Sequence, residues 1–281
     1  MNRISTVKLS LLGLVILLIT YCAAQPESAT KLVLTPVPTE EKPAEEMSLT
    51  IVYDNNAYDP RLRTAWGFAC WLQRGDTCLL FDTGGDASIL LGNMSILGLN
   101  PQDIDVVVFS HIHGDHTGGL MDLLATGARL HVYLPISFPE QFKSSLRELV
   151  TVHEVSKAQE ILPGIYTTGE MGTDIREQGL IVQTNQGLVV ITGCAHPGIV
   201  EMVRQAKVVF DDEIYLVIGG FHLGGLSASR IREVCVAFRE LGVQKLAPCH
   251  CTGEQAMRIF ATEFEGNYMH CGVGRVIDLI P

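Results

Sequence analysis

The stretch 111–116 holds three histidines and one aspartate within six positions, and this cluster constrains the fold more than any other feature. An apolar run directly precedes it, which places the cluster in a loop after a strand. In extended backbone, side chains two positions apart face the same way, so His111, His113 and Asp115 can point at one place. His116 then turns inward as a helix begins. Imidazole and carboxylate groups are ligands of zinc and similar divalent ions. So dense a set predicts two metal ions rather than a solvated polar loop.

Three further histidines each follow an apolar strand and have glycines as near neighbours: His196, His222 and His250. In α/β sheets, ligands bind at the edge where the carboxyl ends of the strands meet. We therefore expect these side chains to join the cluster at one such edge. The other histidines lack this context and are expected to be structural or exposed: His131, His153 and His270.

The acidic composition restricts the partners of the chain. The 281 residues carry a formal net charge of −11, and residues 1–47 contribute only about −1 of it, from four Lys/Arg and five Glu. An acidic domain is a poor binder of polyanions, so we expect a small-molecule substrate and no nucleic-acid partner. A hydrophobic content of 47% with 27 glycines suits a globular α/β protein.

Residues 1–24 are predicted to be an export segment. Arg3 and Lys8 precede the apolar run 9–20, and the short residues 22–24 follow it. The sequence around Cys22 resembles a bacterial lipobox. Three interpretations stay open: a cleaved signal peptide, a lipoprotein signal with Cys22 lipidated, and an uncleaved membrane anchor. Each predicts export, to the outer face of the bacterial cytoplasmic membrane or to the periplasm, with membrane contact only through this segment.

Residues 25–47 are predicted to be a linker. They contain four prolines and a glutamate-rich stretch at 40–46, a composition typical of an extended, solvated tether. The remaining residues, 48–281, are predicted to form the folded domain.

Hydrophobic periodicity predicts alternating strands and helices in this domain. Strands are expected at residues 48–53, 66–72, 77–81, 105–109, 129–134, 151–155, 160–168, 180–184, 187–192, 214–218, 245–247 and 274–280. Helices are expected at residues 86–97, 119–125, 139–149, about 199–210, 227–241 and 254–264. A polar segment at 172–179 is expected near the mouth of the site.

The cysteines do not suit a complete disulfide framework. Seven follow Cys22, and an odd number cannot pair completely. We expect mostly buried thiols, with at most one or two bridges. Cys249 and Cys251 flank His250. The alternation of a strand predicts that both thiols point away when His250 points inward.

The pattern H-x-H-x-D-H after an apolar strand resembles the signature of the metallo-β-lactamase superfamily, whose four positions are filled by His111, His113, Asp115 and His116. Four other stretches resemble one branch of that superfamily: residues 81–84, 193–198, 219–223 and 248–253. This branch includes the 7,8-dihydropterin-6-yl-methyl-4-(β-D-ribofuranosyl)aminobenzene 5′-phosphate synthases. The resemblance implies an α/β fold, an αββα sandwich of two mixed β-sheets flanked by helices.

The resemblance also implies two divalent metal ions, zinc in the first place, with manganese or iron as alternatives. The six expected ligands form two triads: His111, His113 and His196 for one ion, and Asp115, His116 and His250 for the other. Asp82 is expected to accept a hydrogen bond from the second ring nitrogen of a ligating histidine. The alternative role for Asp82 is that of a turn residue or a helix cap. For His222 three roles stay open: metal ligand, substrate contact or proton donor, and structural residue.

In function, the resemblance implies a metal-dependent hydrolase that uses a metal-activated hydroxide on a small anionic ester or phosphodiester. Asp115 would orient the water or take its proton, and His222 would protonate the leaving group. A lactonase or β-lactamase-type amide or ester hydrolase is the alternative enzyme. A different class is a non-catalytic metal or thiol redox or sensor protein, because thiols flank His250. Export does not suit pterin biosynthesis in the cytosol, so that activity is not expected here.

Overall fold

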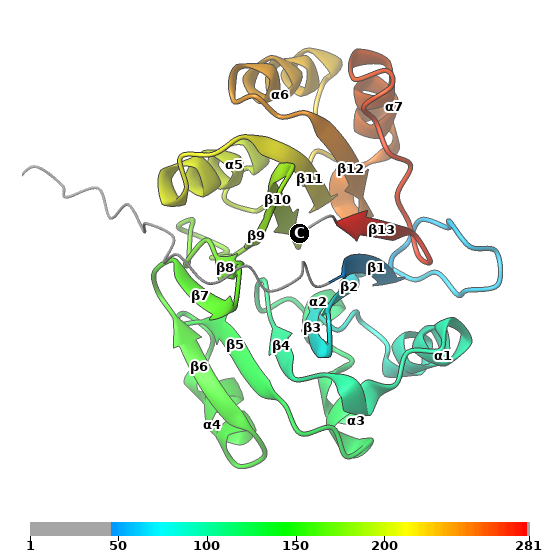
Figure 1. The fold of residues 1–281 in the computed structure, drawn as a ribbon, viewed down its shortest axis with the longest axis vertical. Coiled ribbons are helices and arrows are strands. Elements are labelled where there is room, and N and C mark those ends of the chain that lie inside the picture. Colours follow the sequence, from blue (N-terminus) through cyan, green and yellow to red (C-terminus); the bar gives the residue numbers. More distant parts are fainter. Residues whose placement is uncertain (1–45, 280–281) are drawn as a thin grey trace, which may run out of the picture. The chain divides into compact units, whose positions relative to one another are not determined.

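The computed structural model describes residues 46–279, and in this part of the chain two mixed β-sheets pack against each other (Figure 1). The first sheet has the strand order β13 (Val276–Leu279), β1 (Met47–Tyr53), β2 (Ala69–Arg74), β3 (Thr77–Phe81), β4 (Val106–Val108), β5 (His131–Pro135) and β6 (Thr151–Val155). The second has the order β12 (Lys245–Cys249), β11 (Ile214–Gly220), β10 (Gly187–Thr192), β9 (Leu180–Thr184), β8 (Ile165–Thr167) and β7 (Gln159–Leu162).

Helices cover the outer face of each sheet. On the first sheet these are α1 (Ala87–Leu97), α3 (Leu120–Ala125) and α4 (Glu140–Arg147), and on the second α5 (Ile199–Val209), α6 (Ala228–Glu240) and α7 (Glu254–Glu263) (Figure 1). Leu90, Leu123 and Val107 belong to one outer core, while Met202 and Phe238 belong to the other. A third core lies between the sheets. These layers confirm the expected αββα sandwich.

Each sheet has a parallel part, and the loops of the site leave from its strand ends. Strands β3 to β6 run parallel in the first sheet, and β10 to β12 in the second. The three valines of β4 are buried, because such strands are covered on both faces and favour β-branched side chains. Antiparallel pairing of β13 with β1 closes the first sheet at its other edge, where Figure 1 shows both ends of the described chain side by side.

One predicted strand is wrong. The run 160–168 forms two short antiparallel strands, β7 and β8, instead of one. Gly164 lies between them with φ 73°, a left-handed conformation in which glycine turns the chain at little cost. The other predicted strands and helices have counterparts within a few residues.

The N-terminal predictions lie outside the described residues, except that Met47, assigned to the linker, begins β1. The export segment 1–24 therefore stays a prediction. Within residues 46–279, none of the helices combines the length and the apolar character needed to cross a bilayer.

Candidate metal centre

Unusual backbone conformations shape the loops at the strand ends. In the described chain, four residues other than glycine have a positive φ: Asp82 at 60°, Ala195 at 61°, His222 at 50° and His250 at 46°. All four directly follow or closely follow the strands β3, β10, β11 and β12. A left-handed conformation costs roughly 1–2 kcal/mol for a residue with a Cβ. Its concentration at these loop positions shows that the fold holds the loops in fixed, unfavourable turns.

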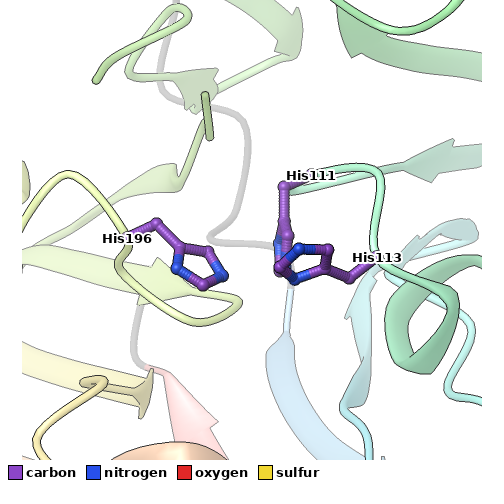
Figure 2. A group of neighbouring side chains, drawn as sticks. All are labelled: His111, His113 and His196. Atoms are coloured by element: carbon purple, nitrogen blue, oxygen red, sulfur yellow. The ribbon is translucent and has the colours of Figure 1, made fainter. Parts of the chain in front are cut away.

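The first triad consists of His111, His113 and His196, whose ligand nitrogens lie within 4.8 Å of one another. Figure 2 shows His196 facing the other two histidines from a separate loop. His111 Nε2 lies 3.0 Å from His113 Nδ1. Two nitrogens on one tetrahedral zinc ion are about 3.3 Å apart when each Zn–N bond is about 2.0–2.1 Å. The first triad therefore has the spacing of a shared ion.

The second triad consists of Asp115, His116 and His250, again with ligand atoms within 4.8 Å of one another. Asp115 and His116 belong to the short helix α2 (Gly114–Thr117), and His250 begins the 3-10 turn η2 (His250–Thr252). Asp115 Oδ2 lies 3.6 Å from His116 Nε2 and 3.5 Å from His250 Nε2. These separations also suit ligands of one ion. The structure thus brings together all six predicted ligands, and their metal binding stays a prediction.

Asp82 and Ser110 determine which nitrogens of two histidines face the centre. The buried Asp82 carboxylate accepts hydrogen bonds from the Ser110 N–H and hydroxyl, both at 2.7 Å, and contacts His116 Nδ1 at 2.7 Å. Because the single hydroxyl proton of Ser110 goes to Asp82, the contact of Ser110 Oγ with His111 Nδ1 at 2.9 Å needs a proton on Nδ1. Both imidazoles therefore keep Nε2 for the centre. Asp82 lies where the sequence puts it, and Ser110 is an additional partner.

His196 and His250 each have a buried ring nitrogen without a hydrogen-bond partner. Asn55 Oδ1 lies 2.9 Å from His250 Nδ1, which leaves Nε2 as the free nitrogen. The Nε2 atoms of His196 and His250 are both buried without a hydrogen-bond partner. Buried polar atoms are seldom left unpaired, so one nitrogen in each triad lacks the partner that a metal ion would supply. The residues present therefore fit a divalent metal.

Glu177 organises the loop that carries His196. Its buried carboxylate accepts hydrogen bonds from the backbone N–H groups of Cys194 at 2.8 Å, Ala195 at 2.9 Å and His196 at 2.9 Å. Burial raises the pKa of Glu177, and the three N–H donors oppose that shift. The segment 172–179 was expected near the mouth of the site, yet Glu177 and Gln178 are fully buried. The polar composition of the segment suggested exposure to solvent. The sequence does not show that the carboxylate of Glu177 binds backbone N–H groups of a distant loop.

The pKa shifts of three candidate ligands suit metal binding. Burial, followed by the neighbouring imidazoles, lowers the pKa of His196 to about 4 and holds that of His111 well below its ordinary value. Burial opposes protonation of His116, but the Asp82 carboxylate outweighs it and raises the pKa. Burial would raise the pKa of Asp115, but His250 and His116 outweigh it and keep this pKa low. Neutral imidazoles and an ionised carboxylate are the forms that bind a metal, so His111, His196 and Asp115 are ready to bind, whereas the imidazole of His116 has to release a proton first.

His222 lies beside the first triad without belonging to it. Its imidazole is exposed, and its ring centroid is 4.4 Å from that of His196. Contact with Cys251 raises the pKa of His222 against the effect of burial. His131 and His153, expected outside the site, stack on each other between β5 and β6.

The thiols follow the sequence expectation only in part. All seven cysteines of the described residues are buried and free, as expected for a chain with few bridges. The predicted orientation of Cys251 is wrong: its sulfur lies within 4.8 Å of the Cys194 sulfur and a ring nitrogen of His222. Strand β12 ends at Cys249, and His250 enters the η2 turn with φ 46°, so the two-residue alternation stops there. Cys249 belongs to the core between the sheets.

Comparison with known proteins agrees with this architecture. A family model described as the metallo-beta-lactamase superfamily matches residues 67–206. The 7,8-dihydropterin-6-methyl-4-(beta-D-ribofuranosyl)-aminobenzene-5'-phosphate synthase of Methanocaldococcus jannaschii is 31% identical over 248 residues, covering 71% of this chain and 83% of that protein. The crystal structure of a metal-dependent hydrolase of the beta-lactamase superfamily has a TM-score of 0.70 and 30% identity, covering 84% of this chain and 100% of that one. YhfI from Bacillus subtilis shares the fold, with a TM-score of 0.63 and 17% identity over 83% of this chain and 99% of that one.

The chain belongs to the metallo-β-lactamase superfamily. It is an enzyme of that fold, and its class is the metal-dependent hydrolases of the superfamily. The predicted resemblance to the superfamily, and within it to the dihydropterin synthase branch, is confirmed.

Proposed function

We propose that this enzyme hydrolyses a small anionic ester or phosphodiester with two divalent ions, in the first place zinc. The observation that carries the proposal is the pair of triads, in which ligand atoms gather within 4.8 Å and each triad holds a buried Nε2 atom without a partner. Metal ions that occupy both triads would supply concentrated positive charge, which favours an anionic substrate.

Bound ions would lower the pKa of a water molecule to about 7 and neutralise charge that develops on the attacked group. The chain supplies the proton transfers. The Asp115 carboxylate, whose pKa is held low, stays ionised and can orient the water or accept its proton. His222 is exposed beside the first triad, and the contact with Cys251 raises its pKa, which favours the protonated form that a leaving group needs.

A substrate panel tests this function. The zinc-loaded protein is expected to turn over bis-p-nitrophenyl phosphate faster than N-acyl homoserine lactones or nitrocefin, and removal of the metal with a chelator is expected to abolish that turnover. Metal analysis should find two ions per chain. Preferred turnover of a lactone or of nitrocefin would support the alternative hydrolase instead. A protein that binds no divalent ion would contradict both.

Trp66 is proposed to contact a flat group of the substrate. Its side chain is 60% exposed, and its ring centroid lies 4.9 Å from that of His250. A stacked aromatic pair contributes about 0.5–1.5 kcal/mol, so Trp66→Ala is expected to raise KM for an aryl phosphodiester about 2- to 12-fold with little change in kcat. Trp66→Phe, the matched control, should retain most of the affinity. Equal KM values for the alanine variant and the native enzyme would exclude this contact.

A further inference from the structure

The sulfur of Cys194 lies between the two triads. Its Sγ atom, the Nε2-bearing imidazole of His116 and the imidazole of His111 form a group whose ligand atoms are within 4.8 Å of one another. His111 belongs to the first triad and His116 to the second. We propose that the Cys194 thiolate is a ligand of both metal ions and joins the two triads through its sulfur. This inference rests on the two-metal site proposed above and adds a seventh ligand to it.

The closest approach has the length expected for two ligands of one ion. Cys194 Sγ lies 3.3 Å from His116 Nε2, the nitrogen that remains free because Asp82 holds Nδ1. A tetrahedral zinc ion with a Zn–S bond of about 2.3 Å and a Zn–N bond of about 2.0–2.1 Å separates sulfur from nitrogen by about 3.5 Å. The sulfur therefore already occupies a ligand position next to the second triad.

The number of ligands leaves room for a shared atom. Each triad supplies three ligands, and zinc takes four or, during catalysis, five, so a shared sulfur can bind both ions and still leave a position for the water. Cys194 is 4% exposed, and His111 and His116 are fully buried. Solvent therefore does not reach these three side chains between the two triads. A thiolate there gives each ion a fourth ligand from one side chain. Its proton leaves to solvent when the metal binds.

The backbone around Cys194 is fixed from several directions. Glu177 accepts the N–H groups of Cys194 and of the next two residues. A Cβ atom at Gly193 would lie 2.2 Å from Ser110 Oγ, so only glycine lets the end of β10 come this close to the loop that begins at Ser110. A Cβ atom at Gly220 would lie 2.7 Å from Cys251 Sγ. The Glu177 hydrogen bonds fix the backbone of Cys194, and the two glycines allow its close approach to the neighbouring loops.

A separate soft-metal site is the competing interpretation. Cys194, His222 and Cys251 also have ligand atoms within 4.8 Å of one another. However, the Cys251 thiol donates to the Cys194 carbonyl oxygen at 3.6 Å, and the His222 imidazole is exposed. Cys251 thus supports the backbone of Cys194, and removal of its sulfur should leave metal–sulfur bonding intact.

Titration of the metal-free protein with Co²⁺ tests the inference without an activity measurement. Thiolate ligation produces a sulfur-to-cobalt charge-transfer band in the near ultraviolet. This band is expected to grow over both the first and the second equivalent of Co²⁺. Cys194→Ser should lose the band. Cys194→Asp should also lose it but retain two ions, because a carboxylate can bridge in place of the sulfur. Cys251→Ser, the matched control, should keep the band.

Each other outcome would overturn the inference and would show which part of it is wrong. Two bound Co²⁺ ions without a charge-transfer band would remove Cys194 from the ligand set and leave the proposed function intact. A band that is complete after one equivalent would assign the sulfur to a single ion. Loss of the band in Cys251→Ser would establish the separate site. Absence of Co²⁺ binding would contradict the proposed function itself. The Cys194→Asp variant keeps the test valid if Cys194→Ser does not fold.

Discussion

Replacement of His113 with alanine is expected to lower the turnover of bis-p-nitrophenyl phosphate by about 1,000-fold or more. Loss of a single stabilising group that acts on the transition state costs on the order of 100- to 1,000-fold, and loss of a metal ligand removes such a group together with its ion. His113 is only half-buried, and its neighbour His111 keeps its own partner, Ser110. The variant should therefore fold normally and bind one ion instead of two.

His153→Ala is the matched control for this experiment. His153 stacks on His131 and Tyr133 at β5 and β6, outside both triads. Its replacement should leave both the metal content and the turnover unchanged. If His113→Ala kept native turnover with two bound ions, the first triad would not be a metal site.

Glu177→Gln is expected to destabilise the protein by about 3 kcal/mol. The carboxylate accepts three buried N–H groups, and the glutamine amide would present an NH₂ group where one of them needs an acceptor. An unsatisfied buried donor costs about 1–3 kcal/mol, and the two remaining hydrogen bonds also lose their charge. For a chain of this size the melting temperature should fall by about 6–12 °C, which thermal unfolding measures.

Glu201→Gln provides the reference for this change. Glu201 forms an exposed ion pair with Arg204 on α5, and such pairs contribute at most about 1 kcal/mol. Its replacement should shift the melting temperature by no more than a few degrees. Similar shifts for both variants would show that Glu177 does not hold the His196 loop. If it does, Glu177→Gln should also weaken zinc binding, because His196 loses its fixed position.

The ligand cluster was predictable because its geometry is local. Six positions after one strand bring His111 and His113 to one triad, but Asp115 faces the other triad, because the extended backbone ends where α2 begins at Gly114. The positions of the later candidate ligands followed from the rule that loops at the carboxyl ends of strands meet, which both sheets obey. His196 and His250 consequently lie where the sequence places them, in two separate triads.

The partners behind the ligands were not predictable in the same way. Asn55 contacts His250 across 195 positions of the chain, and no periodic pattern connects the two residues. Glu177 meets backbone N–H groups, which carry no sequence signal. The error at Cys251 arose from the turn at His250, since strand alternation applies only as far as extended backbone continues. Residues that complete a site through tertiary packing remain visible only in three dimensions.

The left-handed residues at the site have a consequence for how this enzyme can change. Asp82, Ala195 and His250 each hold a conformation that glycine would adopt at lower cost. The free energy of these left-handed conformations lowers the stability of the folded protein, while the turns keep the candidate ligands in fixed positions. A glycine at Ala195 would relax its turn without loss of a polar side-chain contact and would widen the range of directions in which His196 points, whereas replacement of Asp82 or His250 would also remove hydrogen bonds. At Ala195, stability and the proposed metal affinity are thus opposed, and engineering for heat resistance should leave this loop untouched.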